Sequence, residues 1–496
     1  MSQLVATPGR ARAQSWSGFA HRLAWPWQKS EALALSGLLL LILAGNLVQL
    51  GSVIVADMDE GTYLYAGKLV AEGLLPYRDF LLVHPPLIVV LAGAWERLFG
   101  SDIMPARIAF MLLVLASTAP LYAVTRALVR SRFAGLLSVS VYTAGMLLLA
   151  NMGRTVRLEP LMNACLIGAF ACYLLRPDSQ RARTATGALL AAAVLVKLVA
   201  VVPAGLLVLG DLVWARPGRR WIQSWSMAAV GAALVVGAAA PLLLQPGFMD
   251  AVVRSQIERP GLPLEVRLAF LRQDVVRYPV IPLALLAAAG FLLKARDARL
   301  RLVSVVALGT TLVLVFAFRT FYGYYLVQVL PWMAIVVCAA VVPLAQRLAG
   351  RHSRVVLIAA TLVLAGLLPP VYGLVYARTG AYHAASPARI VSLLRDGTGY
   401  VYSMYPSFAL WAGRDPYPWY YAADSLVPRI TGRIGDQEFV RVFADSQALV
   451  TETDELADLP GARAYAEEHF AIAYQDEFWT LWLRRDGVAD RAEQGA

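Results

Sequence analysis

The sequence has few cysteines and few charged residues for its length. Only three of the 496 residues are cysteine, and Cys165, Cys172 and Cys338 all lie inside apolar stretches. This placement argues against a disulfide framework, and the spacing is not that of a metal site. Charged residues make up only 16% of the chain, whereas hydrophobic residues make up 59%. A water-soluble core cannot bury so large an apolar fraction, so the composition predicts a polytopic α-helical membrane protein.

The charges that are present are unbalanced towards the basic side. Lysine and arginine number 44, aspartate and glutamate 33, and the net charge is +11. The basic residues form no face or stripe of the kind that binds nucleic acid, so we expect no nucleic-acid partner. They gather between apolar stretches, where the bias towards basic cytoplasmic loops accounts for them. Residues 1–31 lack a small-residue cleavage site after a short apolar run, which predicts a cytoplasmic tail rather than a signal peptide.

Apolar runs of helix length predict about eleven transmembrane helices within residues 32–376. The runs lie near residues 32–55, 104–126, 133–150, 158–175, 185–198, 201–215, 226–244, 279–294, 300–318, 322–343 and 354–376. The two short runs that meet near Lys197 are either two helices or one interrupted hairpin. The arginine clusters fall in alternate loops, which predicts that these loops are cytoplasmic and that residues 56–103 form the first extracytoplasmic loop.

Three segments on the extracytoplasmic side have predicted secondary structure of their own. Within the first loop, residues 61–73 and 87–99 have helical spacing and predict two helices in the membrane interface. The loop 245–278 contains a predicted short surface helix at 250–258. Residues 377–496 have the composition of a soluble fold and predict a small extracytoplasmic α/β domain. Its expected elements are helices at 386–395 and 436–443, strands at 400–402 and 448–451, and a hairpin of 470–474 with 479–483.

Polar residues cluster on this same side of the predicted bundle. Asp57, Asp59 and Glu60 lie within four residues, directly after the first apolar run. Like charges so close cost free energy unless a solvent shell, a cation or a substrate relieves them. Lys197 lies in a run of Ala, Val and Leu, where an ammonium usually faces a cavity or a partner. The other polar motifs are His84-Pro85-Pro86-Leu87, Arg157-Leu158-Glu159-Pro160 and Tyr324-Tyr325-Leu326-Val327-Gln328-Val329-Leu330-Pro331.

In this order, these motifs resemble those of the GT-C fold membrane glycosyltransferases, within the glycosyltransferase family 39 group of protein O-mannosyltransferases and the aminoarabinose transferase. The resemblance covers roughly residues 32–345. It implies that Asp59 is the catalytic base or the metal-facing group, with Glu60 and Asp57 as helpers. Glu159 is the second acidic position, where aspartate is more usual, and Tyr324 stands where related chains often have histidine.

The chemistry of such a transfer assigns further roles. A lipid-phosphate sugar has a good leaving group, so transfer needs mainly a base on the attacking atom and positive charge on the departing phosphate. The catalytic candidates are Asp59, Glu60 and Glu159. The candidates for binding the donor phosphate are His84, Arg154, Arg157, Lys197 and Arg319. The candidates for acceptor or lipid contacts are Asp57, Tyr63, Tyr322, Tyr324, Tyr325 and Gln328.

Each of these residues also has a structural interpretation. The acids after the first apolar run are placed like ordinary solvated residues at the end of a helix. Glu159 is placed like an acid in the first turn of a helix, where the positive end of the helix dipole favours it. Lys197 is long enough to reach the interface from within the membrane. His84 precedes two prolines and is placed to cap a helix.

We therefore predict an inverting glycosyltransferase, a hexosyl- or pentosyltransferase, in the plasma (inner) membrane. It would move a sugar from a polyprenyl-phosphate donor to a glycan, lipid or protein acceptor on the extracytoplasmic face. The residue types leave open the sugar, the acceptor and whether Mg²⁺ or Mn²⁺ is held by Asp57 and Asp59. The alternatives are a lipid or glycan transporter and a non-catalytic assembly subunit. A transporter should show interrupted helices in corresponding positions of two repeats, and the single interruption near Lys197 has no counterpart.

Overall fold

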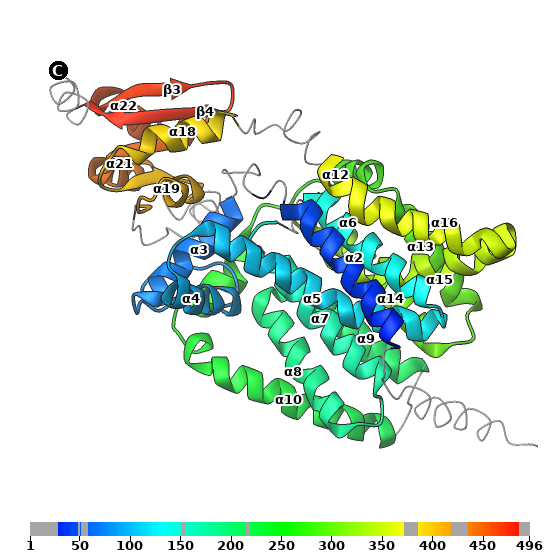
Figure 1. Ribbon diagram of the computed structural model, residues 1–496. Coiled ribbons are helices and arrows are strands. Elements are labelled where there is room, and N and C mark those ends of the chain that lie inside the picture. Colours follow the sequence, from blue (N-terminus) through cyan, green and yellow to red (C-terminus); the bar gives the residue numbers. More distant parts are fainter. Residues whose placement is uncertain are drawn as a thin grey trace, which may run out of the picture.

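The computed structural model describes residues 28–47, 50, 58–150, 154–214, 219–371, 385–417 and 435–485. Figure 1 shows helices of the first 371 residues gathered in one bundle, with a small sheet and its helices beside α3 and α4 at one end. The predicted fold class, a polytopic helical membrane protein with a small C-terminal α/β part, is confirmed.

Helices make up nearly all of the bundle. In chain order they are α2 (Lys29–Leu47), α3 (Met58–Ala71), α4 (Leu87–Phe99), α5 (Ile103–Val129), α6 (Arg132–Ala150), α7 (Leu158–Leu175), α8 (Gln180–Val196), η2 (Leu198–Ala200), α9 (Val201–Trp214), α10 (Arg219–Leu243), η3 (Met249–Arg254), α11 (Ser255–Glu258), α12 (Leu264–Arg277), α13 (Val280–Lys294), α14 (Ala298–Leu312), η4 (Val313–Ala317), η5 (Gly323–Val329), α15 (Leu330–Ala349), η6 (Gly350–His352), α16 (Ser353–Leu362) and η7 (Val363–Leu367).

The number of membrane spans differs from the sequence-based prediction. Seven stretches of the described chain are long and apolar enough to cross a membrane, or eight if α12 and α13, bent by 101°, count as one span. The last stretch, Gly323–Val371, contains both α15 and α16. Helix α8 falls outside these stretches, and α9 lies in a shorter apolar helix, Leu198–Trp214. The predicted number of eleven is therefore not confirmed.

The centre of the bundle is a continuous apolar core. It is built from α5, α6, α7, α14 and α15, whose facing side chains are almost fully buried. Phe170 of α7 packs against Trp332 of α15 with ring centroids 3.9 Å apart. Both ends of α4 are set by residues that stop a helix: Pro86 precedes it and Gly100, with φ of 77°, follows it. Such local signals explain why its predicted bounds, 87–99, match the structure.

The C-terminal part has its own core. Its elements are α18 (Ala385–Arg395), β1 (Val401–Ser403), α19 (Ser407–Trp411), α21 (Asp436–Asp445), β2 (Ala448–Glu452), α22 (Pro460–His469), β3 (Phe470–Gln475) and β4 (Trp479–Arg484). The sheet order is β1-β2-β4-β3, with β1 parallel to β2 and the other neighbours antiparallel. The predicted hairpin is thus the pair β3 and β4. The sequence analysis did not predict α19 or α22.

This C-terminal part is docked on α3. The side chain of Lys68 in α3 forms an ion pair with Asp415. Gly61 lies so close to α19 that a Cβ atom there would be 2.2 Å from the backbone nitrogen of Ser407. Met58, at the start of α3, packs against the C-terminal core. Helix α3 therefore lies between the bundle and the C-terminal part, and it carries the acidic residues predicted to be functional.

Candidate active site

The first turn of α3 presents Asp59 to an arginine. Nη1 of Arg157, the residue before α7, lies 2.9 Å from Oδ2 of Asp59. Both side chains reach solvent, with exposed fractions of 17% for Arg157 and 32% for Asp59. Asp57 lies outside the described residues. Asp59 is therefore a carboxylate that a solute can reach while a cation holds it in place.

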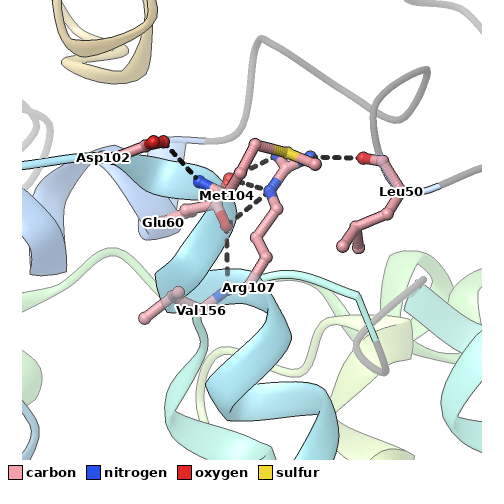
Figure 2. A network of polar contacts seen from close by, with 6 residues as sticks. All are labelled: Leu50, Glu60, Asp102, Met104, Arg107 and Val156. Carbon is pink, nitrogen blue, oxygen red and sulfur yellow. Dashed lines mark hydrogen bonds and ion pairs between the residues drawn. The ribbon is translucent and has the colours of Figure 1, made fainter. Parts of the chain in front are cut away.

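Glu60, the next residue of α3, points in a different direction. Its side chain is fully buried and pairs with the equally buried Arg107 of α5, whose Nε lies 2.9 Å from Oε1 of Glu60 (Figure 2). The same carboxylate accepts a hydrogen bond from the backbone nitrogen of Val156 at 2.9 Å, and Arg107 also donates to the carbonyl of Leu50. Glu60 thus fixes the backbone next to Arg157, which is a positioning role.

A second ion pair lies beside the first. Lys197 follows α8 in an extended conformation, and its ammonium is paired with the carboxylate of Glu159 in the first turn of α7. The exposed fraction is 2% for the Glu159 side chain and 11% for that of Lys197. Lys197 also interacts electrostatically with Asp59. The structure therefore brings together Asp59, Arg157, Glu159 and Lys197, which come from three separate parts of the sequence.

Tyrosines of the 3₁₀ segment η5 cover these cations. The ring centroid of Tyr324 lies 5.8 Å from the Arg157 guanidinium and 5.6 Å from the Lys197 ammonium. Tyr325 lies closer to Lys197, at 4.6 Å, and the ring of Tyr322 is stacked on Tyr324. Aromatic faces attract cations at such distances. The ring of Tyr324 thus lies against both basic residues, Arg157 and Lys197.

His84 and Tyr63 close another side of the group. Their rings meet edge to face with centroids 5.8 Å apart, and the hydroxyl of Tyr77 donates to the carbonyl of His84 at 2.7 Å. Burial, followed by the charges of Lys197 and Arg259, lowers the pKa of His84 to about 3. Burial, followed by the charges of Asp59 and Glu159, raises the pKa of Tyr63 well above its ordinary value. Both side chains are therefore neutral at pH 7, and His84 contributes a hydrogen-bonding group rather than a charge.

Three other residues that the sequence analysis assigned to the site have surroundings that differ from those of Asp59 and Lys197. The buried guanidinium of Arg154 donates to the side-chain oxygen of Asn46 at 2.9 Å and to the carbonyl of Pro369 at 3.2 Å, so it ties the loop before α7 to α2. Arg319 donates to the carbonyl of Ile257 at 2.9 Å. Gln328 is fully buried, and its side-chain amide has no hydrogen-bond partner among the residues that the structure describes.

Arg259 belongs to the group but was missed by the sequence analysis. It follows α11, is half-buried, and interacts electrostatically with His84 and Tyr325. Its loop is held by Arg319, whose carbonyl also accepts from the backbone nitrogen of Leu262 at 2.8 Å. The signal in the sequence is a single arginine before Pro260-Gly261, in a loop predicted to lie on the same side as Asp59.

The predicted ligands for a divalent cation are Asp57 and Asp59. No group of three or more His, Cys, Asp or Glu side chains suited to a metal ion occurs within the described part of the chain. Asp59 is held by Arg157, and the other predicted ligand, Asp57, lies in the segment 51–57 outside it. The described residues therefore place the basic side chains of Arg157 and Lys197 beside one accessible carboxylate, Asp59.

Two solved structures illustrate the overall arrangement that this chain shares with known proteins. ArnT from Cupriavidus metallidurans, in a crystal structure bound to undecaprenyl phosphate, has a TM-score of 0.63 and 14% identity, and the match covers 92% of this chain and 98% of that one. The oligosaccharyltransferase AglB from Archaeoglobus fulgidus, in complex with an inhibitory peptide and a dolichol-phosphate, has a TM-score of 0.55 and 10% identity over 93% of this chain and 75% of that one. The chain therefore has the GT-C glycosyltransferase fold, as its motifs predicted.

A comparison with protein-family models matches part of the chain to one family. The model of the dolichyl-phosphate-mannose-protein mannosyltransferase family matches residues 83–244, which include His84, Arg157, Glu159 and Lys197. No curated protein sequence matches the chain. The chain is thus a membrane protein of GT-C fold with a segment similar to the protein O-mannosyltransferases.

Proposed function

We propose that the chain is an inverting glycosyltransferase that takes a sugar from a polyprenyl-phosphate donor on the extracytoplasmic face of the plasma membrane. The observation that carries this proposal is the grouping of one accessible carboxylate, Asp59, with Arg157, Lys197 and Arg259. Such a group offers a base and an anion-binding surface together, which is what transfer from a phosphate leaving group needs. The undecaprenyl phosphate of the ArnT structure and the dolichol-phosphate of the AglB structure support a donor of this class.

In the proposed reaction, Asp59 accepts the proton of the acceptor hydroxyl or amine as the acceptor oxygen or nitrogen attacks the anomeric carbon. The bond between that carbon and the phosphate oxygen breaks, and its electron pair leaves with the polyprenyl phosphate. One displacement from the opposite face inverts the anomeric centre. No covalent intermediate with the protein is needed, and the proton ends on Asp59.

The departing phosphate is proposed to lie against Lys197 and Arg259. Lys197 is held by Glu159 and faces Tyr325, so the ammonium is oriented before the donor binds. His84, neutral at pH 7, is placed to share a hydrogen bond with the same anion. Arg157 is closer to Asp59 and orients the base. If Mg²⁺ or Mn²⁺ takes part, Asp57 and Asp59 are its candidate ligands, and it would add positive charge at the phosphate.

The test is transfer of radiolabelled sugar from a panel of polyprenyl-phosphate sugars in membranes that contain the wild-type chain or Asp59→Asn. The matched control is Glu72→Gln, which changes an exposed acid just after the same helix. We expect donor-dependent transfer that Asp59→Asn lowers by about 10²–10⁴-fold at unchanged protein level. The control should keep the wild-type rate.

Each other outcome points to one alternative. Equal transfer by wild type and Asp59→Asn would show that Asp59 is not the base. Absence of transfer from every donor would favour the transporter or the assembly subunit. Loss of transfer in EDTA, with recovery on adding Mg²⁺ or Mn²⁺, would add the divalent cation to the mechanism.

A further inference from the structure

The end of the bundle opposite the candidate active site carries a basic cavity. Helix α15 begins next to the tyrosines of η5 and runs for 20 residues, which at 1.5 Å per residue takes the chain about 30 Å away from them. It ends at the turn Gly350–His352, which leads into α16. The turn between α5 and α6, at Arg130 and Ser131, borders the same cavity. By the distribution of arginines, this end is the predicted cytoplasmic one.

The cavity, which we call the arginine cavity, is lined by the side chains of Arg130, Arg132, Arg351 and Arg354 and has a volume of about 610 Å³. No acidic residue lines it within the described part of the chain. Helices α6 and α16 both begin at its edge, and the positive ends of helix dipoles attract anions. Four guanidinium groups and two helix N-termini around one cavity therefore predict a bound anion.

An apolar cavity of about 460 Å³ adjoins the arginine cavity and shares Arg132 and Phe133 with it. It lies between α2, α6 and α16, where Leu38, Leu136 and Leu362 form part of its wall. Glu31, the acidic residue among the described residues that line it, is paired with Arg126 at 3.1 Å. The walls of the apolar cavity therefore suit a hydrocarbon chain. A chain bound there would lie next to the cationic groups of the arginine cavity.

The general preference for basic cytoplasmic loops explains why arginines occur at this end, but it does not require them to surround one cavity. Arg296 and Arg347, for example, belong to the same predicted side and line neither cavity. A ligand that fills both spaces must have an anionic head and a hydrocarbon tail. Basic pockets between helices on the cytoplasmic side suit the head groups of acidic phospholipids.

We propose that this pair of cavities is a binding site for an anionic glycerophospholipid. The phosphodiester lies among Arg132, Arg351 and Arg354, and one acyl chain lies between α2 and α16. The site is separate from the candidate active site, so the lipid is a stabilising ligand at the other end of the bundle and not a donor or an acceptor. No reaction is assigned to it.

Native mass spectrometry with dioleoyl phosphatidylglycerol, and with dioleoyl phosphatidylcholine as the zwitterionic comparison, tests the proposal. The head-group variant is Arg132→Gln/Arg351→Gln/Arg354→Gln, and its control is Arg347→Gln at the same end. The tail variant is Gly37→Leu, because Gly37 lines the apolar cavity and a Cβ there meets no atom within 4 Å. A melting curve of each variant checks that it is folded.

We expect the wild type and Arg347→Gln to bind phosphatidylglycerol in preference to phosphatidylcholine. Three lost charges should weaken phosphatidylglycerol binding by about 100-fold in the head-group variant. Gly37→Leu should also weaken it, although every arginine is intact. Equal binding of phosphatidylglycerol by wild type and head-group variant would overturn the proposal. So would full competition by glycerol phosphate at the same concentration, because the site would then bind a soluble anion rather than a lipid.

Discussion

Asp59 and Glu60 are adjacent in α3 and each pairs with an arginine, yet the two ion pairs differ in almost every other respect. The pair of Asp59 with Arg157 reaches solvent, whereas the pair of Glu60 with Arg107 is fully buried. Successive residues of a helix point about 100° apart, so one turn of α3 faces both the candidate active site and the core. The accessible acid can take part in a reaction, while the buried acid is already fully engaged.

The comparison of the two ion pairs also separates residues that stabilise the fold from residues that can take part in a reaction. A buried ion pair has paid a large desolvation cost, so removing one partner leaves an uncompensated charge inside the protein. A partly exposed pair loses little when one partner is removed, because water replaces it. Changes on the Glu60 side should therefore affect folding, and changes on the Asp59 side should affect the reaction.

The largest effect is expected from Arg107→Met, which breaks the buried pair. It should lower the free energy of unfolding by about 3–5 kcal/mol, because the carboxylate of Glu60 stays buried without its cation. Thermal melting of the purified protein in detergent would measure this. The control is Arg97→Met, since Arg97 is exposed and donates to the carbonyl of Ala71 at 3.1 Å.

The double variant Glu60→Gln/Arg107→Met sharpens this test. It removes both charges, so we expect it to melt higher than Arg107→Met alone. If Arg107→Met melts at the same temperature as Arg97→Met, the buried pair is not the stabilising feature that its geometry indicates.

The next effect concerns the second ion pair of the candidate active site. The double variant Lys197→Gln/Glu159→Gln removes both charges at once and so avoids a lone buried carboxylate. A charged hydrogen bond to the phosphate is worth about 1.5–3 kcal/mol, so kcat/KM for the donor should fall by about 10–10²-fold. We expect most of this fall in kcat/KM to come from a higher KM for the donor, whereas Asp59→Asn should mainly lower kcat. An unchanged KM in the double variant would place the phosphate elsewhere.

Much of the fold was predictable because local signals determine it. The bounds of α4 and α7 match the predicted runs 87–99 and 158–175, where prolines, glycine or charges mark the ends of apolar segments. Helix α12 was missed in the predicted loop 245–278 because it is short, highly charged and not apolar enough to stand out. The 101° bend between α12 and α13 is a tertiary feature, and no local signal indicated it.

The site was only partly predictable for a different reason. Asp59, Arg157, Glu159 and Lys197 could be named because charges near apolar runs are costly and therefore conspicuous. The distinct environments of Glu60 and Arg154 depend on partners that lie far away in the sequence, namely Arg107 and Asn46. Arg259 was missed because charge in an exposed loop is ordinary until its neighbours are known.

Gly61, the residue after Glu60, faces a third direction and tests whether α3 also holds the C-terminal part. In Gly61→Ala the new Cβ would lie 2.2 Å from the backbone nitrogen of Ser407, so α19 must move away. Overpacking of this kind costs about 1–3 kcal/mol. We expect faster proteolytic release of the C-terminal part from Gly61→Ala than from the wild type. Gly205→Ala, where a Cβ meets nothing within 4 Å, is the control, and equal release from both would contradict the close packing.

The smallest effect is a dependence of stability on pH that comes from His84, which lies in the candidate active site. His84 has a pKa of about 3 in the folded protein, below the ordinary histidine value of about 6.5. Between these values the unfolded chain binds a proton that the folded chain does not, so stability falls as the pH falls, by at most about 1.4 kcal/mol per pH unit. In His84→Gln the melting temperature should therefore drop less between pH 6.5 and 5.5 than in the wild type, whereas His352→Gln, at an exposed position, should behave like the wild type. Identical slopes in all three would show that His84 is not held neutral by Lys197, Arg259 and its burial.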